Sequence, residues 1–180
     1  MDIRARINAR KICLAYLYQH CFFCHLEKND KTITESLFAS YIFLTDNEKY
    51  DVAKEALKEK FITYEYLSTP EEIKEFAEIF YDARTPADID YDYVLAITKD
   101  VKIYEAELIA QVNTYAVSFA YDEMDTIDQA IFLLGFAEWK ILETPKNILL
   151  NELIELAKRY SDDWAPKLIN GIMHKIITEE

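Results

Sequence analysis

The chain has 180 residues, enough for one domain with a sizeable core or for two small lobes. Apolar residues make up 51% and charged residues 29%, a balance that excludes an intrinsically disordered chain. The two glycines and four prolines leave few residues for hairpin turns, which argues against an antiparallel β architecture. The net charge of −13 argues against a general nucleic-acid-binding protein.

The basic residues are unevenly distributed. Residues 1–11 hold four basic residues against one acidic residue, whereas residues 12–145 hold 11 basic and 26 acidic residues. Three of the five arginines lie within the first ten positions. Arginine presents a planar fork of donors that suits phosphates and base edges, and lysine lacks this fork. The arginine cluster is the strongest indication of a binding site that composition gives.

The spacing of apolar residues predicts helices throughout the chain. Thr69-Pro70-Glu71-Glu72 is typical of a helix start, with a Thr cap, Pro at the first position and Glu at the third. Thr85-Pro86 and Thr144-Pro145 repeat the Thr-Pro pair. We expect helices at about residues 4–27, from Thr32, from Asp46, from Pro70, and at about 90–120, 127–142, 147–160 and 164–177.

No apolar stretch is long enough to span a bilayer. The apolar run at residues 12–18 is cut by Gln19 and His20, and no small-residue cleavage site follows it. We therefore expect a helix of the mature protein and not a signal peptide. A cytoplasmic location follows, with Cys13, Cys21 and Cys24 reduced.

No catalytic motif is present. A Gly-rich phosphate loop, a nucleophile elbow and a helical His-Glu-x-x-His motif are all missing from the sequence. We expect neither an enzyme nor a bound cofactor. Cys21-Phe-Phe-Cys24-His25 matches the short pattern for haem attachment, and a helix would place His20 beside Cys24 and Cys21 beside His25. A metal or redox site is one interpretation, but we favour small buried cysteines and predict no metal.

Two blocks of the sequence resemble the NusB family of transcription antitermination factors. The first, RINARKICLAYLY, is similar to the opening helix of that family through Arg6, Ala9, Arg10, Leu17 and Tyr18. The second block runs from residue 127 to residue 175 and is similar to the C-terminal half of the family. Its matching residues are Asp128, Glu138, Pro145, Asn151, Glu152, Leu156, Ala157, Lys158, Asn170 and Gly171.

The resemblance implies an all-α fold of two small helical bundles packed as one domain over residues 1–180. The N-terminal lobe would cover about residues 1–84, with an enlarged acidic insert, and the C-terminal lobe about residues 85–180. It also implies a bacterial factor that binds boxA-type single-stranded RNA together with NusE, a small ribosomal subunit protein. Such a complex joins the RNA polymerase elongation complex and supports transcription of ribosomal RNA, and some family members form homodimers.

The resemblance also implies which residues form the sites. The predicted RNA-binding residues are Arg4, Arg6, Arg10, Lys11, Tyr18 and Lys167, and the predicted contacts with NusE are Tyr18 and Asp128. Arg6 and Arg10 are four residues apart on one helix face, as a phosphate clamp requires. The alternative is a protein-interaction scaffold that has lost RNA binding. Gly171 lies within an expected helix, and we expect close helix packing there.

Overall fold

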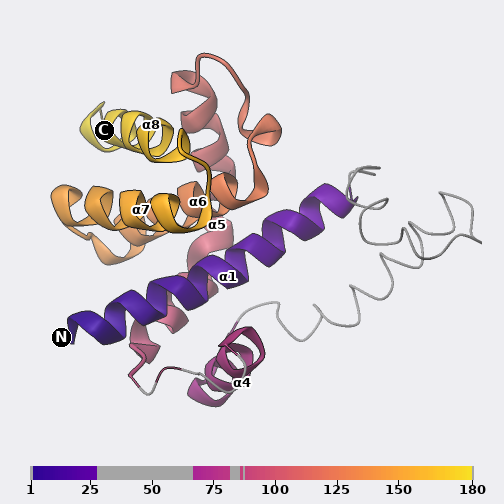
Figure 1. The fold of residues 1–180 in the computed structure, drawn as a ribbon, viewed down its shortest axis with the longest axis vertical. Coiled ribbons are helices and arrows are strands. Elements are labelled where there is room, and N and C mark those ends of the chain that lie inside the picture. The colour runs from indigo at the N-terminus through magenta and orange to yellow at the C-terminus, as the bar shows by residue number, and fades with distance from the viewer. Residues whose placement is uncertain (1, 28–66, 82–85, 87, 180) are drawn as a thin grey trace, which may run out of the picture. The chain divides into compact units, whose positions relative to one another are not determined.

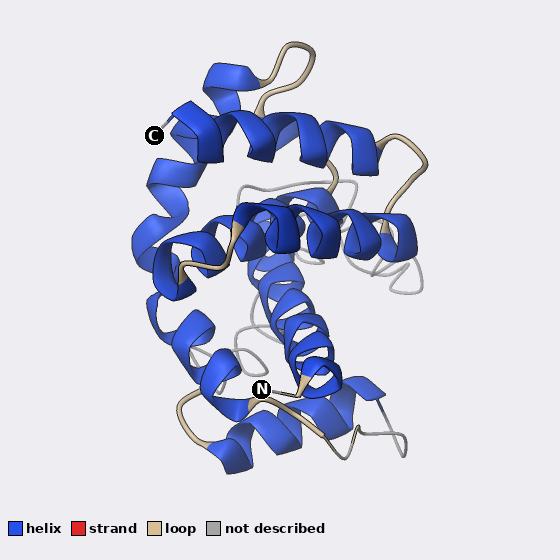
Figure 2. Ribbon diagram, turned by 90° about the vertical axis from the view of Figure 1, so that its left-hand side faces the viewer, coloured by secondary structure: helices blue, strands red, loops and turns tan. Residues whose placement is uncertain are grey.

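The computed structural model describes residues 2–27, 67–81, 86 and 88–179. These residues form six α-helices, one short 3-10 helix and no strand, so the predicted all-α fold is confirmed (Figures 1 and 2). The helices are α1 (Ile3–Glu27), α4 (Pro70–Tyr81), α5 (Tyr91–Tyr115), α6 (Thr126–Leu142), α7 (Lys146–Tyr160) and α8 (Ala165–Glu179), and the 3-10 helix is η3 (Tyr121–Glu123).

The chain divides into two compact units. One contains residues 1–18 and 67–180, and the other contains residues 19–66. The helices expected from Thr32 and from Asp46 lie outside the described residues, as does Thr85. The predicted lobe boundary near residue 85 stays a prediction. No helix in the described part of the chain has the length and apolar composition that a membrane crossing requires.

Local capping explains where two helices begin. The hydroxyl of Thr69 accepts a hydrogen bond from the Glu72 backbone N–H at 3.2 Å, and the Glu72 carboxylate accepts one from the Ser68 N–H at 2.7 Å. The first bond satisfies a backbone donor that the first turn of α4 leaves free, and the second ties the preceding Ser68 to that turn. The predicted helix start at Thr69-Pro70 is confirmed. At α5, the Asp90 carboxylate accepts the Tyr93 N–H at 3.1 Å.

Helix α5 ends five residues before the predicted limit at residue 120. Ala116 has an extended backbone, and the Asn113 side-chain oxygen accepts the N–H of Tyr121 at 2.7 Å. The Gln129 amide donates to the carbonyls of Tyr121 and Met124, both at 2.9 Å. These side-chain hydrogen bonds take the place of the backbone hydrogen bonds of a helix, and the chain turns through η3 toward α6.

Helix α6 forms the centre of the larger unit. Every residue from Asp128 to Glu138 is buried, and α6 contacts α5, α7 and α8. Gly135 permits the approach of α7, because a Cβ at this position would overlap the side chain of Leu153. The prediction of close packing at Gly171 is wrong. Gly171 faces open space, with no neighbouring atom within 4 Å of a Cβ built there.

Candidate nucleic-acid interface

The start of α1 is fixed against the start of α5 by polar contacts. The Arg6 Nε donates to Asp90 Oδ2 at 2.8 Å, and the Asp90 backbone N–H donates to the carbonyl of Ala5 at 3.3 Å. The side-chain amide of Asn8 donates to the carbonyl of Asp88 at 2.9 Å. The guanidinium carbon of Arg6 also lies 4.6 Å from the centre of the Tyr93 ring, a cation–π distance. These contacts hold the arginine-rich start in one orientation.

Arg10 is buried, with a relative accessibility of only 5%. Its Nε donates to Glu138 Oε2 at 2.9 Å and its Nη2 donates to Glu138 Oε1 at 2.7 Å, so the two groups form a two-point ion pair. The Nη1 atom lies 3.0 Å from Glu152 Oε2 on α7. One side chain of α1 therefore joins α6 and α7 through two carboxylates.

Glu138 has no exposed surface, and four donors satisfy its carboxylate. Besides the two from Arg10, the Tyr93 hydroxyl donates to Oε2 at 2.7 Å and the Thr144 hydroxyl donates to Oε1 at 2.9 Å. A buried carboxylate is tolerable only when it is paired and hydrogen-bonded in this way. The network connects α1, α5, α6 and the segment before α7.

The protonation states of the network follow from its geometry. Burial alone would lower the pKa of Arg10, but the hydrogen bonds and the negative charge of Glu138 outweigh burial and raise it. Burial, and then the charge of Glu138, raise the pKa of the Tyr93 hydroxyl well above its ordinary value. The network therefore holds a charged guanidinium and a neutral phenol at physiological pH.

The structure separates the predicted RNA-binding residues into different environments. Arg4 and Lys167 are exposed, Lys11 is half-buried, and Tyr18 is 40% exposed. Arg6 and Arg10 lie on one face of α1, but carboxylates already engage both guanidinium groups. The geometry thus favours a positioning role for Arg10 and does not support it as a direct phosphate contact.

Asp128, predicted as a contact with NusE, lies inside the protein at 5% accessibility. Its Oδ1 accepts a hydrogen bond from the Ser161 hydroxyl at 2.6 Å, which ties α6 to the end of α7. Burial raises the pKa of the Asp128 carboxyl, and the charges of Asp125 and Asp162 raise it further, while the Ser161 bond opposes this shift. This placement favours an internal role over a contact with a partner.

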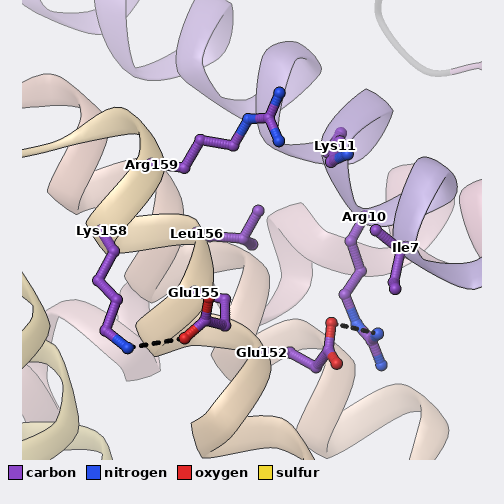
Figure 3. Close-up of a pocket in the computed structure, with 8 residues that line it drawn as sticks. All are labelled: Ile7, Arg10, Lys11, Glu152, Glu155, Leu156, Lys158 and Arg159. Carbon is purple, nitrogen blue, oxygen red and sulfur yellow. Dashed lines mark hydrogen bonds and ion pairs between the residues drawn. The ribbon is translucent and has the colours of Figure 1, made fainter.

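A pocket of about 460 Å³ opens between α1 and α7 (Figure 3). It is lined by Ile7, Arg10 and Lys11 of α1 and by Glu152, Glu155, Leu156, Lys158 and Arg159 of α7. Sequence reasoning placed Lys11 in the site but missed Lys158 and Arg159. The sequence feature that could have predicted these two residues is their Lys-Arg pair, which follows the last buried residue of the amphipathic helix α7.

The three cysteines differ in exposure. Cys13 is fully buried, Cys21 is 3% exposed, and Cys24 is half-buried. The predicted pairing of His20 with Cys24 is confirmed, with 3.8 Å between His20 Nε2 and Cys24 Sγ. The burial of Cys13 and Cys21 agrees with our interpretation of them as small hydrophobic residues.

Comparison with known proteins identifies the family. The model of the NusB family matches residues 52–178 of the chain. The transcription antitermination protein NusB of Campylobacter lari is 33% identical over 109 residues, which are 61% of this chain and 83% of that protein. The protein of the same name from Clostridium botulinum is 32% identical over 98 residues, or 54% of this chain and 70% of that protein. The chain therefore belongs to the NusB family, and the resemblance read from its sequence is confirmed.

Other relatives are matched over a smaller share of their length. The NusB protein of Gloeothece citriformis is 32% identical over 85 residues, which are 47% of this chain and 40% of that protein. In the NusB proteins of Cyanothece and Microcystis aeruginosa the match spans 41% and 39% of the relative. The chain thus spans about two fifths of the length of these three curated relatives.

Proposed function

We propose that this protein is a transcription antitermination factor that binds boxA-type RNA together with NusE, within the RNA polymerase elongation complex, and supports transcription of ribosomal RNA. Its membership of the NusB family supports this function, as do relatives that are named as transcription antitermination proteins. The proposal also includes a cytoplasmic location.

The observation that carries the proposal is the anchoring of the basic helix start. Arg10 and its two carboxylate partners fix α1 against α6 and α7, so Arg4 and Lys11 project from a rigid frame. A binding group on a rigid element loses less conformational entropy when its ligand arrives. Arg10 thus supports the interface from inside, while Arg4, Arg6 and Lys11 supply its contacts.

The remaining predicted residues have separate roles in the proposal. Tyr18 lies two turns beyond Lys11 on α1, and its exposed ring can stack on an unpaired base or contact NusE. Lys167 is exposed on α8 and would contact a phosphate. Arg6 would exchange part of its contact with Asp90 for a phosphate oxygen, since its side chain keeps 18% exposure.

The charge of the protein sets the expected strength of binding. With only a few phosphate contacts, counterion release supports modest affinity. The net charge of −13 would repel RNA outside the basic start. NusE, by sharing the RNA, would supply the rest of the affinity.

Fluorescence anisotropy of a labelled boxA-like RNA, with and without NusE and at two salt concentrations, tests this function. We expect salt-sensitive binding that tightens when NusE is added. The double variant Arg4→Gln/Arg6→Gln should weaken binding, whereas Lys175→Gln on α8, whose ammonium lies over Tyr115, should not. Absence of binding to RNA under every condition would overturn the proposal.

A scaffold function without RNA is the second candidate, and one observation favours it. Two of the three arginines at the start of α1, Arg6 and Arg10, are already neutralised by carboxylates. A protein of this fold could then act through protein contacts, either with a partner or with a second copy of itself. Size-exclusion chromatography and affinity capture with purified NusE would favour this function if a complex formed without RNA and without salt-dependent RNA binding.

A further inference from the structure

The pocket between α1 and α7 contains two cations that no carboxylate of the described residues neutralises. Of the four basic residues that line it, Arg10 is paired with Glu138 and Glu152, and Lys158 is paired with Glu155 at 2.7 Å. Within the described part of the chain, no ion pair joins Lys11 or Arg159 to a carboxylate. The two acidic residues of the lining are therefore engaged, and the charge left over is positive.

Lys11 and Arg159 are near enough to repel one another. Burial lowers the pKa of the Lys11 ammonium, and the positive charge of Arg159 lowers it further. The Arg159 side chain extends from α7 toward α1, on which Lys11 lies (Figure 3). An anion between the two groups would replace this repulsion with two attractive contacts.

Arg159 is held in a way that leaves its donors available. Its guanidinium carbon lies 5.5 Å from the centre of the Tyr160 ring, and a stacked guanidinium keeps its N–H groups directed outward from its edge. Lys11 adds a compact charge from the facing helix. A guanidinium and an ammonium side by side can together donate hydrogen bonds to the oxygens of one phosphate group.

We propose that Lys11 and Arg159 form a phosphate-binding pocket that holds one backbone phosphate of the bound RNA. The pocket volume of about 460 Å³ leaves room for the group and its waters. Lys11 is seven residues beyond Arg4 on the same helix, or about 10 Å along its axis, so one strand can reach both. This inference rests on the proposed RNA-binding function and extends the interface from α1 onto α7.

The first experiment measures the salt dependence of RNA affinity for Lys11→Gln, Arg159→Gln and the double variant. The matched control is Lys146→Gln, which removes one charge from the other end of α7, where Lys146 bonds the Thr178 hydroxyl. We expect the double variant to bind about tenfold more weakly and to lower the slope of log affinity against log salt by about 0.7, the loss of one phosphate contact. Because both side chains share one phosphate, each single variant should lose most of that affinity.

The second experiment needs no RNA. Nitrogen-15 NMR of the protein is recorded while inorganic phosphate replaces chloride at constant ionic strength. We expect the Lys11 and Arg159 side-chain signals to shift with saturation, and the Lys146 signal to stay in place. In Arg159→Gln the shift of Lys11 should be lost while the helical circular dichroism spectrum is retained.

The outcomes separate the two proposals. Wild-type protein that binds RNA, with a double variant no weaker than Lys146→Gln, would overturn the pocket and leave the RNA-binding function standing. Wild-type protein that does not bind RNA, yet shows the phosphate shift, would overturn the RNA assignment and leave a pocket for another phosphate-bearing ligand. No phosphate shift and no RNA effect would overturn the pocket altogether.

Discussion

The guanidinium of Arg10 and the carboxylate of Glu138, 128 positions apart in the chain, form a two-point ion pair inside the protein. Tyr93, Thr144 and Glu152 complete the set of partners. This arrangement makes Arg10 the residue through which the basic helix start is attached to the core. The orientation of the proposed RNA-binding surface therefore depends on a contact that RNA itself cannot reach.

Replacing Arg10 with Lys should destabilise the protein by about 2–4 kcal/mol, because an ammonium cannot donate to Glu138 at two points and also reach Glu152. Urea denaturation monitored by circular dichroism measures this change in the free energy of unfolding. Arg159→Lys is the matched control, since Arg159 is exposed and should change stability by no more than about 0.5 kcal/mol. A loss below about 1 kcal/mol for Arg10→Lys would show that the network contributes little.

Replacing each of the two glycines with alanine should change the stability of the protein in opposite directions. Gly135→Ala places a Cβ against the buried Leu153 side chain, and we expect a loss of about 1–2 kcal/mol from overpacking, after any gain in helix propensity. Gly171→Ala meets open space within α8 and should stabilise by about 0.5–1 kcal/mol. Thermal and urea denaturation compare both variants with the wild type. Equal effects of the two substitutions on stability would contradict the close contact at Gly135 and the open space at Gly171.

The contrast between these glycines shows how far sequence alone can predict this fold. The Thr-Pro-Glu signal at Thr69 and the apolar run of α6 predicted helix positions, because capping and periodicity are local properties. Which glycine lies at a helix crossing depends on the face that meets another helix. Gly135 and Gly171 both lie in helical sequence, and only the tertiary arrangement separates them.

The same limit applies to the site. The arginine cluster and the resemblance to the NusB family predicted a basic surface at the start of the chain, where Arg4 is exposed and Lys11 is half-buried. Nothing in the spacing of Arg6 and Arg10 indicated their acidic partners, because Asp90 and Glu138 lie 84 and 128 positions away. Arg159 escaped notice for a similar reason, since its position opposite Lys11 arises only when α7 packs on α1.

Asp128 should make stability depend on pH. Burial and the neighbouring Asp125 and Asp162 raise the pKa of its carboxyl in the folded protein above the ordinary value of 3.8. The folded state then holds this proton more tightly than the unfolded state, so the contribution of Asp128 becomes less favourable as pH rises from 3.8 through the raised pKa. In Asp128→Asn this change is removed, while the amide oxygen can still accept from Ser161.

The measurement is urea denaturation of wild type and Asp128→Asn at several values from about pH 4 to about pH 7. The stability of the variant relative to wild type should increase with pH across this range. Asp163→Asn, at an exposed position nearby, serves as the matched control and should show a smaller change. If the free energy of unfolding of Asp128→Asn relative to wild type decreased as pH rose, the pKa of Asp128 would not be raised in the folded protein.

The reaction rates of the cysteine thiols should depend on how deeply each cysteine is buried in the protein. Cys13 is fully buried, and burial together with the charge of Glu138 raises the pKa of its thiol, so little reactive thiolate forms. Cys24 is half-buried and should react with a disulfide reagent faster than Cys13 by about 100-fold or more. The fast phase should be absent in Cys24→Ser. Persistence of that phase would assign it to another cysteine.

Labelling of Cys13 should then require the opening of the structure around Arg10. If opening is fast relative to the reaction, the labelling rate follows the population of the open state, and each 1.4 kcal/mol of lost stability raises it about tenfold. Arg10→Lys should therefore accelerate Cys13 labelling by about 30-fold to 1,000-fold, for a loss of about 2–4 kcal/mol. Mass spectrometry of the labelled peptides identifies the thiol. An unchanged Cys13 rate in a variant that has lost this stability would mean that Cys13 opens locally, without release of the Arg10–Glu138 pair.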